Sequence, residues 1–423
     1  MGSMKKEQIR IDRRRFLKGA GAAALAAFLS RCGAPTEPPT SISSTPTPRP
    51  VADPTATPTS SPTASATPTN SAFQSPFQSP LESPLAPTAT EVPPPTATRP
   101  PTPTPTPTAT PFPPGPPTKL GLFVAWYHPQ IMDLVATGNV ALIKTLEFDP
   151  TFLADIKARS PETLIVGRVT LGQVDLNQAD LKPAARQAVD AMLPLALDER
   201  RAGLIDAWEG YNEPVPGSPE QMVRLAELEV ERVRLLAEKG LRAVVGNFGA
   251  GQPPLEWWPQ FRPALEAAQA HRGYLGLHEY SAPTIWFNTN RNPLDFNAHA
   301  ADEGWLTLRY RKVYRQYLQP WGLPLPLLLT EVGVDGLVTD RPGPPGGGWR
   351  DFADHWDELG MGRDTAGNYI EQLAWYDSQL QQDDYVHGAA IFAMTAFEAW
   401  NTYQLQGEAA AILQQYLSVH PAP

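Results

Sequence analysis

The sequence contains a single cysteine, Cys32, among 423 residues. One cysteine cannot form an internal disulfide, and it cannot build a zinc site from several thiolates. The sequence also lacks an HExxH motif, an acidic calcium-binding loop and histidine pairs at metal-binding spacing. We therefore expect a fold that is stabilised by its hydrophobic core, with no cofactor and no catalytic metal.

No hydrophobic run in the sequence is long enough to span a bilayer. The apolar run at residues 20–30, "AGAAALAAFLS", is well short of the roughly 20 residues that a membrane-spanning helix needs. It follows "DRRRFLKG", whose paired arginines resemble a twin-arginine export signal. Residues 1–33 are therefore predicted to be an export signal. We expect an exported protein, extracellular or at the cell surface.

The cysteine lies at the end of this signal, in "LSRC", which resembles a lipoprotein box. Arg31 stands where such a box has a small residue. Cys32 is therefore either acylated after cleavage of the signal or an incidental thiol in an ordinary cleaved signal. Any membrane tether is confined to the N-terminus.

Residues 34–118 have few apolar side chains and consist mostly of Pro, Thr, Ser and Ala, with 27 of the 49 prolines. Such a composition cannot bury enough apolar surface to offset the entropy of ordering a chain. This segment is predicted to be a disordered or polyproline-like linker. The remaining residues, 119–423, are predicted to form one domain.

Basic residues are in the minority, with 34 Lys and Arg against 44 Asp and Glu, a net charge of −10. Because residues 1–33 carry +6 and the linker carries −2, residues 119–423 carry −14. An acidic domain repels nucleic acid and anionic membrane surfaces. We therefore expect a neutral substrate and no nucleic-acid partner.

Eight short apolar runs alternate with helical patterns through this domain, as expected for buried parallel strands covered by helices. One helical pattern, residues 218–240, has a capping serine at Ser218, a proline in its first turn and a closing glycine. Residues 302–319 and 368–382 are predicted to be helical in the same way. The strand candidates are residues 120–126, 141–148, 163–170, 203–213, 242–249, 273–281, 326–333 and 388–395.

This alternation predicts a single α/β domain, a (β/α)8 TIM barrel. A doubly wound open sheet is the alternative, but no glycine-rich phosphate loop follows any of the strands. In a (β/α)8 barrel the active site lies at the carboxyl ends of the strands. Polar residues at those ends are therefore the candidates for function.

Two glutamates end predicted strands that face each other across the barrel, Glu213 on the fourth and Glu331 on the seventh. Cleavage of a glycosidic bond uses two carboxyl groups in this arrangement. One protonates the leaving oxygen, and the other attacks or stabilises the anomeric carbon. A separation of about 5 to 5.5 Å would indicate retention of configuration, and repulsion between the two would raise the pKa of one.

The motifs around both glutamates resemble clan A glycoside hydrolases, in particular the cellulase-like and β-xylosidase-like members. The motifs are "WEGYNEP", which ends in Pro214, and "LLLTEVG". The resemblance implies a retaining hydrolase of β-linked, neutral oligo- or polysaccharides, with Glu213 as acid/base and Glu331 as nucleophile. It also implies that Asn212 binds the sugar 2-hydroxyl. Because of Pro214, we expect Glu213 to be extended.

The resemblance further implies that Tyr280, in "HEY", orients the nucleophile with His278 as its companion. The clan has an arginine from strand two beside the nucleophile, where this chain has "LIKTLE". Arg168 on strand three is the nearest candidate for that position. Glu209 is expected to be a supporting group or a core ion pair. Glu279 is expected to face the helices in a structural salt bridge.

All eleven tryptophans lie in residues 119–423. Aromatic faces stack on sugar rings, so tryptophans in loops above the barrel are candidate sugar platforms. By resemblance, Trp400 is expected to support the sugar at the cleaved bond. Trp126 and Trp286 are further candidates, while others pack loops onto helices. The long loop at residues 335–362 is expected to shape one end of the cleft.

Two other functions stay open. A transglycosylase would use the same residues with a sugar in place of water. A non-catalytic carbohydrate-binding protein on a degenerate barrel would usually have lost one of the glutamates, and both are present. We expect a monomer.

Overall fold

The computed structural model describes residues 112–287, 289 and 302–421. The predicted export signal, Cys32 and most of the predicted linker lie outside the described residues. Within the described part of the chain, no helix combines the length and hydrophobicity needed to cross a membrane.

Eight parallel strands close into a barrel in the order of the sequence, β1 to β8, which confirms the predicted (β/α)8 fold. All eight apolar runs contain or overlap a strand, because their side chains are buried both inside the barrel and under the helices. The strands are β1 (Leu120–Val124), β2 (Leu142–Thr145), β3 (Leu164–Gly167), β4 (Ala207–Glu209), β5 (Ala243–Phe248), β6 (Tyr274–Ser281), β7 (Leu327–Val334) and β8 (Val386–Thr395).

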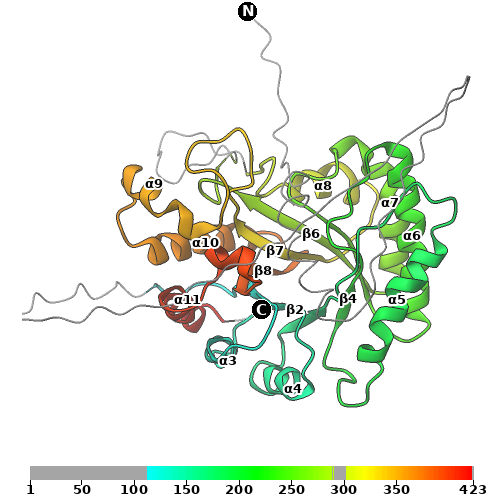
Figure 1. The fold of residues 1–423 in the computed structure, drawn as a ribbon, viewed down its shortest axis with the longest axis horizontal. Helices are drawn as coiled ribbons and strands as arrows, with labels where there is room; N and C mark the ends of the chain where they lie inside the picture. The colour runs from blue at the N-terminus through cyan, green and yellow to red at the C-terminus, as the bar shows by residue number, and fades with distance from the viewer. Residues whose placement is uncertain (1–111, 288, 290–301, 422–423) are drawn as a thin grey trace, which may run out of the picture. The chain divides into compact units, whose positions relative to one another are not determined.

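Helices surround the strands, with α5, α6 and α7 along one side of the barrel and α10 and α11 along another (Figure 1). The α-helices are α3 (Pro129–Val135), α4 (Pro150–Arg159), α5 (Lys182–Ala196), α6 (Pro219–Ala237), α7 (Trp258–Ala270), α8 (Tyr310–Val313), α9 (Ala353–Glu358), α10 (Thr365–Leu380) and α11 (Glu408–Val419). Single turns and short helices complete the fold: η2 (Leu255–Trp257), η3 (Tyr314–Leu318), η4 (Trp349–Phe352) and η5 (Glu398–Tyr403).

Helix α6 starts where the sequence predicts. The side chain of Ser218 accepts a hydrogen bond from the backbone of Gln221, which satisfies one of the amides that a helix start leaves unpaired. Apolar residues such as Met222, Leu225 and Val233 form its buried face. The helix therefore combines a local start signal with a face that the barrel covers.

The predicted helix at residues 302–319 is wrong in its first half. Helix α8 starts only at Tyr310, because the backbone amides of Leu308 and Tyr310 donate to the carboxylate of Glu279 at 2.7 and 2.9 Å. Leu308 has a φ of 59°, outside the right-handed helical region. A contact with β6 therefore decides where this helix begins.

Residues 112–118, at the end of the predicted linker, pack along the C-terminal end of the domain. The ring of Phe112 lies edge-on to Tyr416, with ring centroids 5.2 Å apart. The amides of Gly115 and Thr118 donate to the carbonyls of Val419 and Pro421, both at 3.0 Å. This packing leads the chain into β1.

Candidate active site

Glu213 lies in the loop after β4, four residues beyond the last strand residue Glu209. Its φ is 45°, so the expectation of an extended backbone at Glu213 is wrong. Proline disfavours the right-handed helical region at the residue before it, and a left-handed backbone also avoids that region. The amide of Glu213 donates to the carbonyl of Asn247 on β5 at 3.0 Å and holds this conformation.

Gly249 leaves room for the side chain of Glu213 because it has no Cβ atom. A Cβ atom added at Gly249 would lie 3.2 Å from Cδ and Oε1 of Glu213, closer than ordinary side-chain contacts. Glu213 is only 9% exposed. The carboxyl group is therefore held at the barrel mouth in a conformation that costs on the order of 1 kcal/mol or more, as strained residues at functional sites do.

Glu331 lies within β7 and is 5% exposed. Tyr280 on β6 donates its hydroxyl hydrogen to Oε2 of Glu331 at 2.8 Å. Lys144 on β2 donates to Oε1 at 3.0 Å, and Nη1 of Arg168 lies 3.8 Å from the same oxygen. Charge-assisted donors of this kind stabilise the ionised carboxylate.

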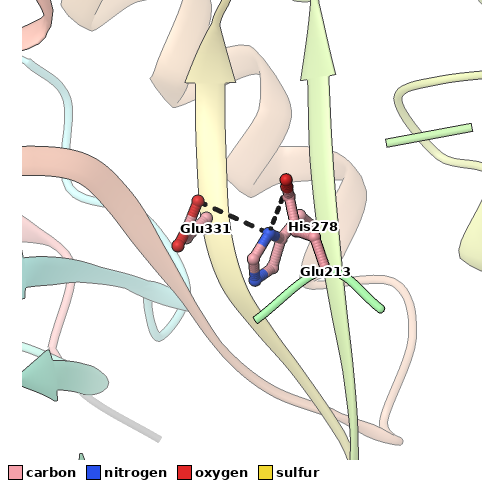
Figure 2. A group of neighbouring side chains, drawn as sticks. All are labelled: Glu213, His278 and Glu331. Atoms are coloured by element: carbon pink, nitrogen blue, oxygen red, sulfur yellow. Dashed lines mark hydrogen bonds and ion pairs between the residues drawn. The ribbon is translucent and has the colours of Figure 1, made fainter. Parts of the chain in front are cut away.

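The side chain of His278 lies between the two glutamates (Figure 2). Its Nδ1 atom is 2.8 Å from Oε1 of Glu213 and 3.4 Å from Oε2 of Glu331. One oxygen of each carboxylate and one nitrogen of His278 all lie within 4.8 Å of one another. His278 on β6 pairs in register with Glu331 on β7, so the sheet itself sets this arrangement.

Lys144 is the residue that the motif analysis missed. Its side chain is fully buried, and its Nζ lies 2.9 Å from Oε2 of Glu209 and 3.0 Å from Oε1 of Glu331. The core ion pair expected for Glu209 is thus present. A lysine inside a four-residue apolar strand is a buried charge that requires a partner, and that signal could have identified it.

Arg168 and Asn212 lie together beside Glu331. Nη1 of Arg168 donates to Oδ1 of Asn212 as well as approaching Glu331. Gln173 donates to the carbonyl of Asn212 at 3.1 Å. Arg168 therefore fixes the direction of the Asn212 amide and links it to the carboxylate site.

Glu279 faces the helices, as expected, and within the part of the chain that the structure describes it forms no salt bridge of the expected kind. Its carboxylate accepts hydrogen bonds from the amides of Leu308 and Tyr310 and, at 2.7 Å, from the hydroxyl of Tyr376 on α10. Backbone amides supply two of these hydrogen bonds because the chain before α8 passes over this strand. Burial raises the pKa of Glu279 from 4.5 to about 7.

The candidate tryptophans lie in different surroundings. Trp400 is partly buried and packs edge-on against Phe392, with centroids 5.6 Å apart, and Phe392 in turn packs on Tyr280. Trp126 packs against the exposed ring of Phe397. Trp286 is 8% exposed and packs edge-on against a tryptophan of α10. Trp126 and Trp400 therefore keep partly exposed rings, whereas the ring of Trp286 is mostly covered.

Glu213, His278 and Glu331 also have the composition and closeness of a three-ligand metal site. The ammonium of Lys144 lies 3.0 Å from Glu331 and 3.4 Å from Nε2 of His278. A divalent cation would be repelled by this ammonium, which already neutralises part of the carboxylate charge. The donor set therefore fits proton transfer and charge stabilisation better than it fits a metal.

Comparisons with known proteins give structural similarity at low sequence identity. No protein-family model matches the chain, and no curated protein matches its sequence. The chain is similar to a GH128 (subgroup I) endo-β-1,3-glucanase from Amycolatopsis mediterranei in complex with laminaritriose, at 12% identity and a TM-score of 0.40, covering 71% of this chain and 99% of that one.

Two further solved structures are similar at the same level. One is a GH128 (subgroup II) endo-β-1,3-glucanase from Pseudomonas viridiflava, at 17% identity and a TM-score of 0.37, covering 72% and 98%. The other is a β-glucuronidase from Ruminococcus gnavus, at 12% identity and a TM-score of 0.44, covering 71% of this chain and 50% of that one. Similarity at this level establishes no shared activity. The closed order of the eight parallel strands shows a (β/α)8 barrel on its own.

Proposed function

We propose that the barrel is a retaining glycoside hydrolase that cleaves β-linked bonds in a neutral glycan. The observation that carries the proposal is the pair of buried glutamates, Glu213 after β4 and Glu331 on β7, with one carboxylate oxygen of each within 4.8 Å of the other. Retaining enzymes have carboxyl groups about 5 to 5.5 Å apart, whereas inverting enzymes need roughly 6.5 to 9.5 Å to admit a water.

The surroundings of the two glutamates favour one assignment of roles. The carboxylate of Glu331 is contacted by Lys144 and by the hydroxyl of Tyr280, with Arg168 nearby, so its charged form is stabilised. A charged carboxylate is the form that attacks an anomeric carbon. Glu213 contacts the imidazole of His278 and is the acid/base in this proposal.

The reaction then has two balanced steps. Glu213 gives its proton to the glycosidic oxygen, the bond from that oxygen to the anomeric carbon breaks, and Glu331 forms an ester with the carbon. Glu213, now a carboxylate, takes a proton from water. The water oxygen then attacks the anomeric carbon, the ester breaks, and both glutamates return to their starting states.

The substrate class follows from charge and from the rings at the mouth. The predicted barrel domain carries −14, which disfavours an anionic glycan. Trp126 and Trp400 keep partly exposed rings that can lie against the C–H face of a sugar. Asn212, oriented by Arg168, can bind a sugar hydroxyl. A screen of β-glucans, xylans, mannans and galactans identifies the glycan and the linkage.

Variants of both glutamates test the assignment. Glu213→Gln and Glu331→Gln should each lower kcat on the best glycan by at least about 10³-fold. The exposed Glu162, which precedes β3 at its other end, supplies the matched control, and Glu162→Gln should keep full activity. If either site variant keeps most of its activity, the assignment is wrong.

Azide separates the two roles. With an activated aryl β-glycoside, Glu213→Ala should still form the ester but lack the base, so azide should restore turnover and yield a β-glycosyl azide. With Glu331→Ala, azide can attack only in place of the missing nucleophile and should yield the α-glycosyl azide. If Glu213→Ala yields the α-glycosyl azide and Glu331→Ala the β-glycosyl azide, the roles of acid/base and nucleophile are reversed.

We also propose export through residues 1–33, supported by the paired arginines and the apolar run. Cell fractionation of the full chain tests this, with Arg13→Lys together with Arg14→Lys as the export-deficient variant. Cys32→Ser separates a lipid anchor from a cleaved soluble form, because only an acylated protein changes from the membrane to the soluble fraction.

A further inference from the structure

The ammonium of Lys144 lies close to three groups that can accept a hydrogen bond. Nζ lies 2.9 Å from Oε2 of Glu209, 3.0 Å from Oε1 of Glu331 and 3.4 Å from Nε2 of His278. An ammonium group has three donors and no acceptor. Because Lys144 lies between two carboxylates and is charged, Nε2 of His278 must accept from it.

This contact fixes the protonation of His278. A neutral imidazole carries its hydrogen on one nitrogen and a lone pair on the other. Since Nε2 accepts, the hydrogen is on Nδ1, which is the atom that faces both catalytic glutamates. An imidazolium, or the Nε2–H tautomer, would direct an N–H group at the ammonium and lose this contact.

One N–H group therefore donates to Oε1 of Glu213 at 2.8 Å and has Oε2 of Glu331 3.4 Å from its nitrogen. The reaction moves a negative charge between these two groups. It is on Glu331 in the resting enzyme and on Glu213 once Glu331 has become an ester. A hydrogen bond to a charged acceptor is roughly twice as strong as one to a neutral acceptor.

We propose that His278 is a neutral, Nδ1-protonated donor whose single N–H group stabilises the negative charge first on Glu331 and then on Glu213, and that Lys144 is a positioning residue that fixes this tautomer. His278 exchanges no proton in the cycle. This inference rests on the proposed function. It also places the acid proton of Glu213 on Oε2, because Oε1 accepts from the imidazole.

The tautomer is tested directly by nitrogen-15 NMR of the full chain labelled at its seven histidines, with His278→Phe to assign the signal. The expected result at neutral pH is a protonated Nδ1 and an unprotonated Nε2. Lys144→Arg should keep this pattern because a guanidinium also donates, while Lys144→Met should lose it. A protonated Nε2 in the wild-type protein overturns the proposal, whether or not the variants fold.

The kinetic role is tested with aryl β-glycosides of different leaving groups. A poor leaving group needs the proton of Glu213, so charge develops on Glu213 in the first step. His278→Phe should lower kcat/KM by about 10- to 100-fold for such a substrate, as for loss of a hydrogen bond to a charged group. For a dinitrophenyl leaving group, which needs little acid help, the loss should be less than about 3-fold.

Equal losses on both substrates would show a merely structural role and overturn the inference. The proposed function fails separately, if Glu213→Gln and Glu331→Gln keep their activity. If His278 has the expected tautomer but Glu213→Gln and Glu331→Gln remain active, the inferred local geometry is correct and the proposed function is wrong. The two failures are therefore distinguishable.

Discussion

Glu331 and Glu279 are two buried glutamates on neighbouring strands of one barrel, and their surroundings differ in kind. Glu331 on β7 is 5% exposed at the barrel mouth, and its oxygens contact a lysine ammonium and a tyrosine hydroxyl. Glu279 on β6 is 2% exposed under the helices, and it accepts from two backbone amides and the hydroxyl of Tyr376.

The difference shows how burial alone fails to identify a catalytic group. Backbone amides fix Glu279 between β6, the start of α8 and helix α10, which makes it a structural link. The groups around Glu331 are the charged or polar side chains of Lys144, Arg168 and Tyr280. These different partners accompany the catalytic role that we propose for Glu331 and the structural role of Glu279.

The largest expected effect separates the two glutamates by activity. Glu331→Gln should lower kcat by at least about 10³-fold. Glu279→Gln should keep kcat within about 5-fold, because the carboxylate of Glu279 contacts the chain before α8 and helix α10. Steady-state kinetics and urea unfolding of both variants check this, and similar activity losses in both would remove the distinction.

The second effect is a pH dependence of stability that belongs to Glu279. Its pKa is raised from 4.5 to about 7 by burial, so between these pH values the folded state binds more protons than the unfolded state. Stability from this group is then fully present below pH 4.5 and falls as the pH rises through 7. The loss is on the order of 3 kcal/mol.

Urea unfolding of the wild type and Glu279→Gln from pH 4.5 to above 7 measures this loss of stability, because the variant cannot titrate at this position. The difference in unfolding free energy between the two proteins should change with pH in that window. A constant difference would mean that the three hydrogen-bond donors keep Glu279 ionised in spite of burial.

A third prediction compares the tyrosines that contact the two glutamates. Tyr280→Phe removes the hydroxyl that donates to Glu331 at 2.8 Å. It should lower kcat by roughly 10- to 100-fold, since a hydrogen bond to a charged group contributes about 1.5–3 kcal/mol. Unchanged kcat would show that Tyr280 does not act on Glu331 in the reaction.

The smallest effect concerns the tyrosine on the structural side. Tyr376→Phe removes one of the three donors to Glu279 and should lower the free energy of unfolding by about 1–2 kcal/mol. Activity at a temperature well below unfolding should stay at the wild-type level. A loss of activity comparable to that of Tyr280→Phe would break the comparison, because both glutamates would then influence the chemistry.

The barrel could be predicted from the sequence because its strands are continuous apolar runs and their carboxyl ends meet at one rim. Glu213, Glu331 and His278 were found by that rule, and the structure brings them together. Lys144 was missed because it lies inside β2 and not at its end. Its side chain reaches the site through the interior of the barrel, whereas the rule considers only residues at the ends of strands.

The surroundings of Glu279 could not be read from the sequence for a different reason. Two of its three donors are backbone amides some 30 residues away along the chain, and any residue except proline can supply an amide. The left-handed backbone of Glu213 was missed in the same way, since the carbonyl of Asn247 that holds it comes from another strand. Because almost every residue type has the same backbone amide and carbonyl, the sequence does not reveal contacts that are made through the main chain.

The most direct test of the account is to trap the ester on the nucleophile. The protein is incubated with activated 2-deoxy-2-fluoro-β-glycosides of the gluco, xylo, manno and galacto series, and the labelled peptide is identified by mass spectrometry. If Glu331 is the nucleophile, one sugar per chain should be bound to Glu331, and Glu331→Gln should carry no label. A label on another residue, or efficient turnover of the best glycan with inverted configuration of the first product, would contradict it.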